Sequence, residues 1–231
     1  MLEISPTEWT AILLSLRVAV IATLVATPFG IALAWLLARR DFWGKSVLDA
    51  IVHLPLVLPP VVTGYLLLLT FGKRGMVGAW LADHLGIVFA FRWTGAALAC
   101  GVMSFPLLVR PIRLSIEAID RRLEQAAETL GAAPWRVFAT VTLPLALPGV
   151  LAGMVLGFAK AIGEFGATIT FVSNIPGETQ TISSAIYSLI QTPEGDSAAG
   201  RLVIISVVIA MSALVAAEWF ARRATARLHG H

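Results

Sequence analysis

The sequence predicts an all-α integral membrane protein with five transmembrane helices. Hydrophobic residues make up 58% of its 231 residues and charged residues only 13%, and the mean hydropathy of +0.84 is far above that of a soluble domain. Uncharged stretches recur along the chain, and about 20 such residues are enough to cross a bilayer core as a helix. Barrel strands would instead alternate polar and apolar residues over about ten positions.

Five stretches form the predicted spans of a single membrane domain covering residues 1–231. They run over about residues 9–38, 47–71, 94–116, 137–172 and 201–221. Backbone N–H and C=O groups in lipid must be satisfied within the segment, which favours helices at this length. The first stretch begins with Glu3 and Glu8 instead of a basic region and is too long for a removable signal peptide, so we expect it to remain as a span.

Lysine and arginine are distributed unevenly over the predicted loops. Eleven fall on one side, namely Arg39, Arg40, Lys45, Arg110, Arg113, Arg121, Arg122, Arg136, Arg222, Arg223 and Arg227, against Lys73, Arg74, Arg92 and Arg201 on the other. Basic loops are retained in the cytoplasm, so the N-terminus is predicted outside and the C-terminus inside. The same bias accounts for the net charge of +3 without nucleic-acid binding.

The loop after the third predicted span contains a short amphipathic helix over about residues 118–131. Its start is strongly charged, while Leu123, Ala126, Ala127 and Leu130 recur on one face. Gly131 ends it, where a glycine suits a left-handed cap. Periodicity alone favours an anchor on the membrane surface.

A motif within this loop favours a different role. Gln125-Ala126-Ala127, three residues, Gly131, nine residues and Val141-Thr142-Leu143-Pro144 resemble the cytoplasmic signature of ABC importer permeases, which reads Glu-Ala-Ala, three residues, Gly, nine residues, Ile, any residue, Leu-Pro. In that family the helix is a coupling helix seated on a separate ATPase subunit.

The resemblance implies a type I ABC importer permease fold and an ATPase-coupling role for one set of residues. These are Glu124, Gln125, Ala126, Ala127, Leu130, Gly131, Leu143 and Pro144. Gln125 replaces the glutamate of the family. Glu124 points about 100° away around the helix and is not an automatic substitute.

The resemblance extends over roughly residues 14–221. The segments 53–60, 103–106 and above all 163–179, which begins Gly163-Glu164-Phe165-Gly166, look like molybdate permeases, and sulfate permeases are similar around Glu164. This similarity implies an inner-membrane subunit that imports an oxyanion, with molybdate favoured over tungstate and sulfate. It also implies a second permease copy, two cytoplasmic ATPase subunits that bind ATP–Mg, and a periplasmic substrate-binding protein.

Enzymatic chemistry is not expected in this chain. A P-loop needs a glycine five residues before Gly-Lys-Ser, but Arg39 occupies that position before Gly44-Lys45-Ser46. No catalytic triad, acid pair or Cys/His cluster appears, so we expect no catalytic residue, metal or cofactor here.

Prolines interrupt the second predicted span. Pro55, Pro59 and Pro60 remove three amide donors, which lipid tolerates only where protein or water satisfies the freed carbonyls. Transport pathways are often built from such interruptions. The alternative is a static kink packed against a neighbour.

Lys160 and Glu164 lie one turn apart inside the fourth predicted span. They are either a structural ion pair or part of a gate. Glu164 would repel an oxyanion, so hydroxyls and amides are better contacts. The predicted pathway set is Pro55, Pro59, Pro60, Lys160, Gly163, Glu164, Phe165, Gly166, Thr168, Thr170 and Ser173.

Two further patterns concern packing. Gly149, Gly153, Gly157 and Ala161 lay a smooth stripe that favours close helix contact over pathway lining. On the predicted outer side, residues 179–192 repeat apolar positions at helical spacing but are too few to span.

A channel or anchoring scaffold without a motor is the rival function. Removal of the ATPase should abolish transport by a permease and leave a channel conducting.

The charge bias generates a topology prediction. Reporter fusions after Arg40, Arg122 and Arg222 should all report cytoplasm, because basic loops stay inside, and a fusion after Gly177 should report the outside. A cytoplasmic Gly177 reporter would refute this topology.

Overall fold

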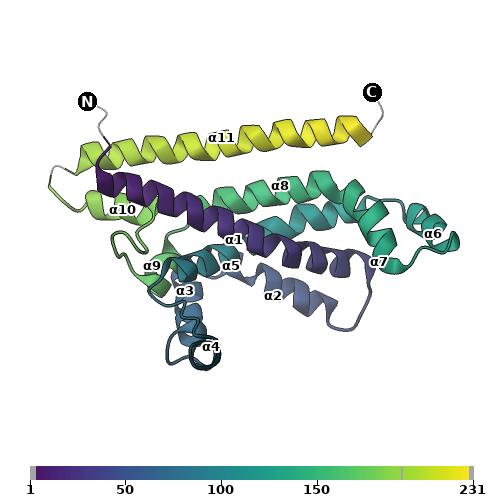
Figure 1. Ribbon diagram of the computed structural model, residues 1–231, viewed down its shortest axis with the longest axis horizontal. Helices are drawn as coiled ribbons and strands as arrows, with labels where there is room; N and C mark the ends of the chain where they lie inside the picture. The colour runs from purple at the N-terminus through teal and green to yellow at the C-terminus, as the bar shows by residue number, and fades with distance from the viewer. Residues whose placement is uncertain (1–3, 194, 229–231) are drawn as a thin grey trace.

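The computed structural model describes residues 4–193 and 195–228, which form helices joined by turns and loops (Figure 1). In chain order the elements are α1 (Pro6–Arg39), α2 (Lys45–Val57), α3 (Pro60–Phe71), α4 (Met76–Leu85), α5 (Trp93–Glu117), α6 (Arg121–Thr129), α7 (Pro134–Val137), the π-helical turn η1 (Phe138–Thr142), α8 (Leu143–Ile162), α9 (Gly166–Val172), α10 (Ile182–Leu189) and α11 (Asp196–Leu228). The predicted all-α class is confirmed.

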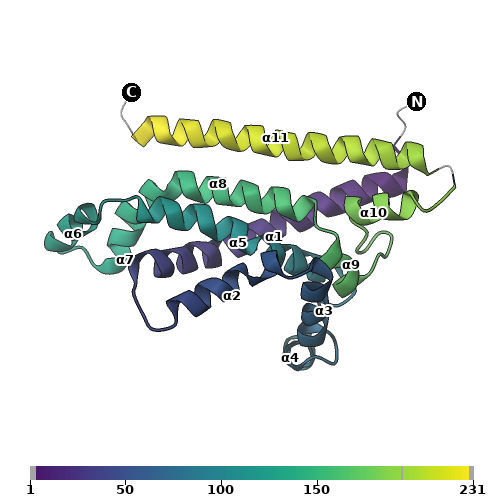
Figure 2. The same cartoon turned by 180° about the vertical axis from the view of Figure 1, so that it is seen from behind.

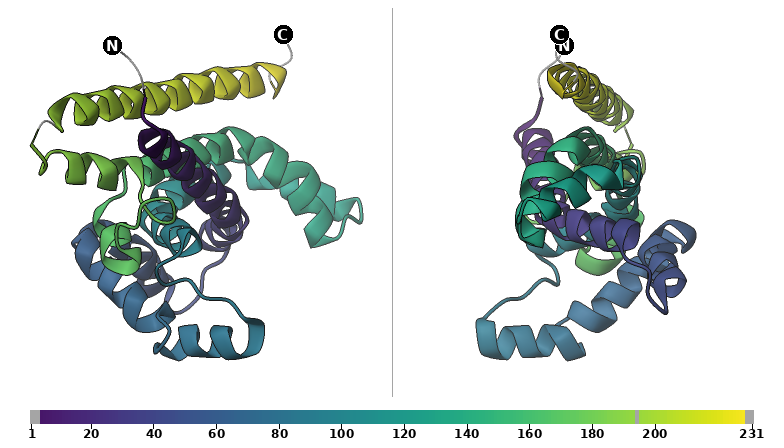
Figure 3. Two further views of the ribbon diagram at one scale, coloured as in Figure 1. Left: turned by 60° about the vertical axis from the view of Figure 1, so that its left-hand side comes forward. Right: turned by 90° about the vertical axis from the view of Figure 1, so that its right-hand side faces the viewer.

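The long helices run along one axis, with different elements at each end. Figure 2 shows α5 between α8 and α2, and α11 follows α8 on the outside. Helices α6 and α7 project at one end (Figure 1), whereas α3 and α4 leave the bundle near the other (Figure 3). At that second end, α1 and α11 are joined by an ion pair of 2.9 Å between Glu8 and Arg201.

Helix α5 is the centre of the bundle. Leu108, Val109 and Ile112 are fully buried between α1 and α8. On α8, a Cβ atom added at Gly153 would lie 2.5 Å from the Leu108 carbonyl oxygen, and Gly149 lies against Ser115. The predicted close packing of the glycine stripe is confirmed, and its partner is α5 of the same chain.

The second predicted span is broken, as its prolines indicated. Within the described residues, four helical segments are long and apolar enough to cross a membrane: α1, α5, residues 134–162 and residues 196–216. A fifth span exists only if α2 and α3 count together, and the chain bends by 114° between them. Pro59 and Pro60 supply no N–H at the bend, while Pro55 lies inside α2.

The prediction that the fourth span continues to residue 172 is wrong. Helix α8 ends at Ile162, and α9 begins only at Gly166. The Glu164 carboxylate accepts the N–H of Ala167 at 3.0 Å, which satisfies a donor at the start of α9. Apolar stretches flank this break on both sides, and hydropathy averaged over a window therefore does not reveal it.

Other elements differ from the sequence prediction in detail. The inner helix is shorter than residues 118–131: Asp120 caps its start and Gly131, with φ +86°, follows its end. The left-handed cap is thus confirmed, as is a helix between residues 179 and 192, which is α10. Helix α4 was not predicted, because its ten residues are too few to form a span.

Candidate coupling site and transport pathway

Helix α6 exposes apolar side chains at the end of the molecule. It is charged, and none of its residues is buried. Leu123 is 50% exposed, Leu130 89% and the nearby Trp135 67%. Large apolar side chains gathered on an otherwise polar projection are typical of a surface that another protein covers.

The structure brings the two halves of the predicted coupling motif together. Gln125 and Ala126 are exposed on α6, and Ala127 is half-buried. The hydroxyl of Thr142, directly before Leu143 and Pro144, donates a hydrogen bond to the Glu124 carboxylate. Leu143 packs at the edge of the core around α5, and Pro144 is exposed in the first turn of α8.

Glu124 faces the membrane domain. Its Oε2 lies 3.0 Å from Nε of Arg39 in the last turn of α1, and the two side chains are only 14% and 8% exposed. Sequence analysis placed Glu124 with the ATPase-facing residues and gave no sign of this inward contact, because Arg39 is 85 residues away.

The two helix interruptions pack against each other. A Cβ atom at Gly64 of α3 would lie 2.5 Å from the carbonyl oxygen of Ala167, and one at Gly166 would lie 2.7 Å from Cβ of Pro60. The broken second span and the break before α9 therefore form one continuous site. Sequence analysis identified both segments but not their contact.

Lys160 and Glu164 form an ion pair at this site. Nζ of Lys160 lies 2.7 Å from Oε2 of Glu164, and the side chains are 30% and 1% exposed. The predicted pairing is confirmed; a gating role stays a prediction. Both carboxylate oxygens have a partner, since the other one accepts the Ala167 N–H.

The hydroxyls predicted to contact an oxyanion are differently placed. Thr168 and Thr170 donate to the carbonyls of Phe165 and Gly166 inside α9. Thr168 is buried and Thr170 half-buried, whereas Ser173 is exposed with φ +65°. Of the three, Ser173 is the most accessible to a solute.

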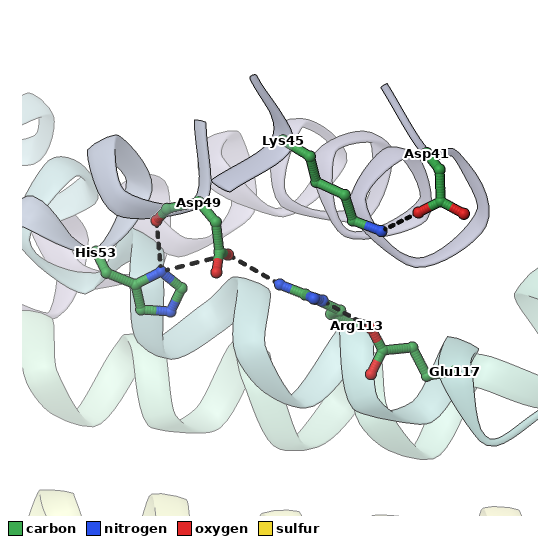
Figure 4. A network of polar contacts seen from close by, with 6 residues as sticks. All are labelled: Asp41, Lys45, Asp49, His53, Arg113 and Glu117. Carbon is green, nitrogen blue, oxygen red and sulfur yellow. Dashed lines mark hydrogen bonds and ion pairs between the residues drawn. The ribbon is translucent and has the colours of Figure 1, made fainter. Parts of the chain in front are cut away.

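A polar network attaches α2 to α5 (Figure 4). Nη1 of Arg113 lies 2.9 Å from the Asp49 carboxylate, and Nε of Arg113 donates to Glu117 at 2.8 Å. Nearby, Lys45 bonds to the exposed Asp41, and this hydrogen bond, together with the positive charge, lowers the pKa of Asp41. The network fixes the orientation of α2, which packs loosely.

Fold and site together define a membrane-embedded helical chain from which α6 and α7 project at one end (Figure 1). Residues 26–226 match the family described as the binding-protein-dependent transport system inner membrane component. The chain belongs to this family, whose members are permease subunits of ABC importers in the inner membrane.

Relatives and solved structures agree with this family. The chain is 63% identical to Molybdenum transport system permease protein ModB of Escherichia coli strain K12 over 93% of its length and 94% of the relative's. It is 56% identical to ModB of Haemophilus influenzae, with 96% of both chains covered. A probable sulfate transport system permease protein of Chlorella vulgaris is 35% identical over 87% of this chain and 76% of that protein.

A bacterial alginate ABC transporter, solved in complex with a pentasaccharide-bound periplasmic protein, has the same fold. The TM-score is 0.74 at 21% identity, with 95% of this chain and 80% of the other covered. The predicted type I importer permease fold is confirmed.

The buried ion pair generates an asymmetric stability prediction. Lys160→Met leaves the buried Glu164 carboxylate without its cationic partner and should lower the free energy of unfolding by about 3–5 kcal/mol. Glu164→Gln should cost less, because the 30% exposed Lys160 reaches solvent more easily. Thermal unfolding in detergent should therefore rank the variants in this order.

The double variant Lys160→Met, Glu164→Gln distinguishes the two roles of the pair. It removes both charges, so a structural pair predicts recovered stability and recovered transport. Recovered stability without transport would instead assign the pair to the gate. Equal destabilisation by the two single variants would contradict the predicted asymmetry.

Proposed function

We propose that the chain is the permease subunit of an ATP-driven importer that carries molybdate across the bacterial inner membrane. The observation that supports molybdate as the substrate is the 63% identity, over 93% of this chain, to a molybdenum transport permease. The exposed apolar tip of α6, within the importer signature, supports the motor-driven mechanism.

The assembly we propose contains two copies of this chain, two ATPase subunits and a periplasmic binding protein. The sequence carries no P-loop, so ATP–Mg belongs to the ATPase subunits. The docking residues are Gln125, Ala126, Ala127, Leu130 and Gly131, continued by Leu143 and Pro144. The apolar outer face of α11 is suited to lipid or to the second copy.

The orientation we propose places the N-terminus in the periplasm and the C-terminus in the cytoplasm. It rests on the eleven-to-four distribution of basic residues. Helix α6 and the Arg113 network then lie at the cytoplasmic side, and α10 lies at the periplasmic side.

The pathway we propose runs past the paired interruptions. Its residues are those of the two breaks and the adjoining α9, namely Pro55, Pro59, Pro60, Lys160, Gly163, Glu164, Phe165, Gly166, Thr168, Thr170 and Ser173. Interrupted helices present backbone groups to a solute, and weak polar contacts permit its release. ATP binding would close the ATPases, move α6 and switch the spans from inward-open to outward-open.

Sulfate import is the second candidate. The 35% identical relative from Chlorella vulgaris supports it, but less strongly than the relatives at 56% and 63% support molybdate. A channel or scaffold without a motor is disfavoured because it needs no exposed docking helix.

Competition for uptake tests the substrate. Cells with the gene should take up labelled molybdate, and cells lacking it should not. Tungstate, a dianion of nearly the same size, should compete strongly and sulfate weakly. Sulfate competition as strong as that of tungstate would move the assignment to sulfate, and uptake that survives loss of the ATPase would indicate a channel.

Gly131→Val tests the coupling role of α6. The φ of +86° is a left-handed conformation that costs about 1–2 kcal/mol for a residue with a side chain, and more for a branched one. The strain should displace the end of α6, so the variant should insert normally but copurify with less ATPase. Ala127→Phe should do the same by adding bulk to the docking surface.

Gly86→Val is the matched control. Gly86 also follows a helix, has φ +66° and has open space around its Cβ position, but it lies after α4. It should carry similar strain and retain the ATPase. Normal transport and normal ATPase binding by Ala127→Phe would refute the coupling role, because added bulk would leave a surface anchor unharmed.

A further inference from the structure

Apolar packing does not hold α6 in place. None of its nine residues is buried; Leu123 is exposed, and so is Leu130 directly after the helix. A cavity of about 270 Å³ lies on its inner side, lined by Trp35, Gln125 and Phe138 among others. The position of α6 relative to the spans therefore depends on specific polar bonds.

Those bonds converge on Glu124 and the end of α1. Arg39 reaches the Glu124 carboxylate at 3.0 Å and the carbonyl of Ile119 at 3.3 Å. Arg121 in turn approaches the Ala38 carbonyl at 3.5 Å. A side chain at the end of α1 thus bonds to α6, and a side chain at the start of α6 bonds back to the α1 backbone.

The same carboxylate also contacts the start of α8. Its Oε1 accepts the hydroxyl of Thr142, the last residue of η1, which is 1% exposed. Turns of π-helix are frequent at functional sites and interrupt the regular ladder. From there α8 runs about 30 Å as one helix to the break at Gly163. Glu124 is therefore the side chain of α6 that bonds both to α1 and to the helix leading to the interruptions.

We propose that Glu124 is a positioning residue that transmits movement of α6 to α1 and α8, and that it does not itself bind the ATPase. The inference rests on the proposed function, since it assumes an ATPase on the outer face of α6. It separates two neighbours in the motif: Gln125 is exposed, whereas Glu124 bonds inward to Arg39 and Thr142.

Two near-isosteric variants remove the connection without touching the exposed surface. Glu124→Gln removes the charge that pairs with Arg39, and Thr142→Val removes the hydroxyl. In the purified complex with ATPase and molybdate-loaded binding protein, both should retain ATPase copurification and basal hydrolysis. Stimulation of hydrolysis by the loaded binding protein and uptake should fall together by about ten-fold.

The charge exchange Arg39→Glu, Glu124→Arg should recover much of the lost stimulation and uptake, because it restores the ion pair in reverse. Lys45→Gln is the matched control: it removes the ion pair with the exposed Asp41 on the same side of the bundle and should behave as wild type. A role limited to folding would instead lower the amount of complex and leave stimulation per complex unchanged.

Each alternative result overturns a defined part of the proposal. Normal stimulation and uptake by Glu124→Gln would show that Glu124 transmits nothing. Loss of ATPase copurification in Glu124→Gln would place Glu124 in the docking surface. Failure of the wild-type chain to bind an ATPase would refute the proposed function itself.

Discussion

Inside a bilayer, a backbone N–H or C=O group without a partner costs several kcal/mol, and this chain interrupts its helices twice. Both interruptions need compensation from protein. At the second, the Glu164 side chain accepts the N–H of Ala167, and Lys160 neutralises the carboxylate. At the first, Pro59 and Pro60 have no N–H, and Pro60 lies against Gly166 of α9. The arrangement of α3, α8 and α9 follows from satisfying these groups.

Glycine makes the contact between the interruptions possible. Side chains at Gly64 and Gly166 would overlap the backbone of Ala167 and the ring of Pro60, so the two segments approach at backbone distance. Gly149 and Gly153 likewise let α8 approach the backbone of α5 closely. A rigid three-helix core of α1, α5 and α8 therefore carries a pair of irregular segments at one end and the projecting α6 at the other (Figure 1).

The sequence predicted the features that depend on local pattern. The helical class, the limits of α1 and α5, the break at Pro59 and the left-handed Gly131 all follow from composition, proline and glycine chemistry. The break at Gly163 escaped prediction because the apolar stretches before and after it read as one continuous span. The contacts of Glu124 with Arg39 and of Gly64 with Ala167 join residues far apart in the chain, and no local pattern encodes such pairs.

The direction of a side chain also explains a departure in the coupling motif. Neighbouring helix residues differ by about 100° around the axis, and on α6 the Glu124 carboxylate bonds to Arg39 while Gln125 is exposed beside the same cavity. Because Glu124 lies against Arg39, its charge is neutralised within the chain. The residue aligned with the glutamate of the family, Gln125, is uncharged and exposed. Under the proposed coupling role, the exposed Ala126 and Leu130 offer apolar contact to a partner, while Glu124 holds the helix against its own membrane domain.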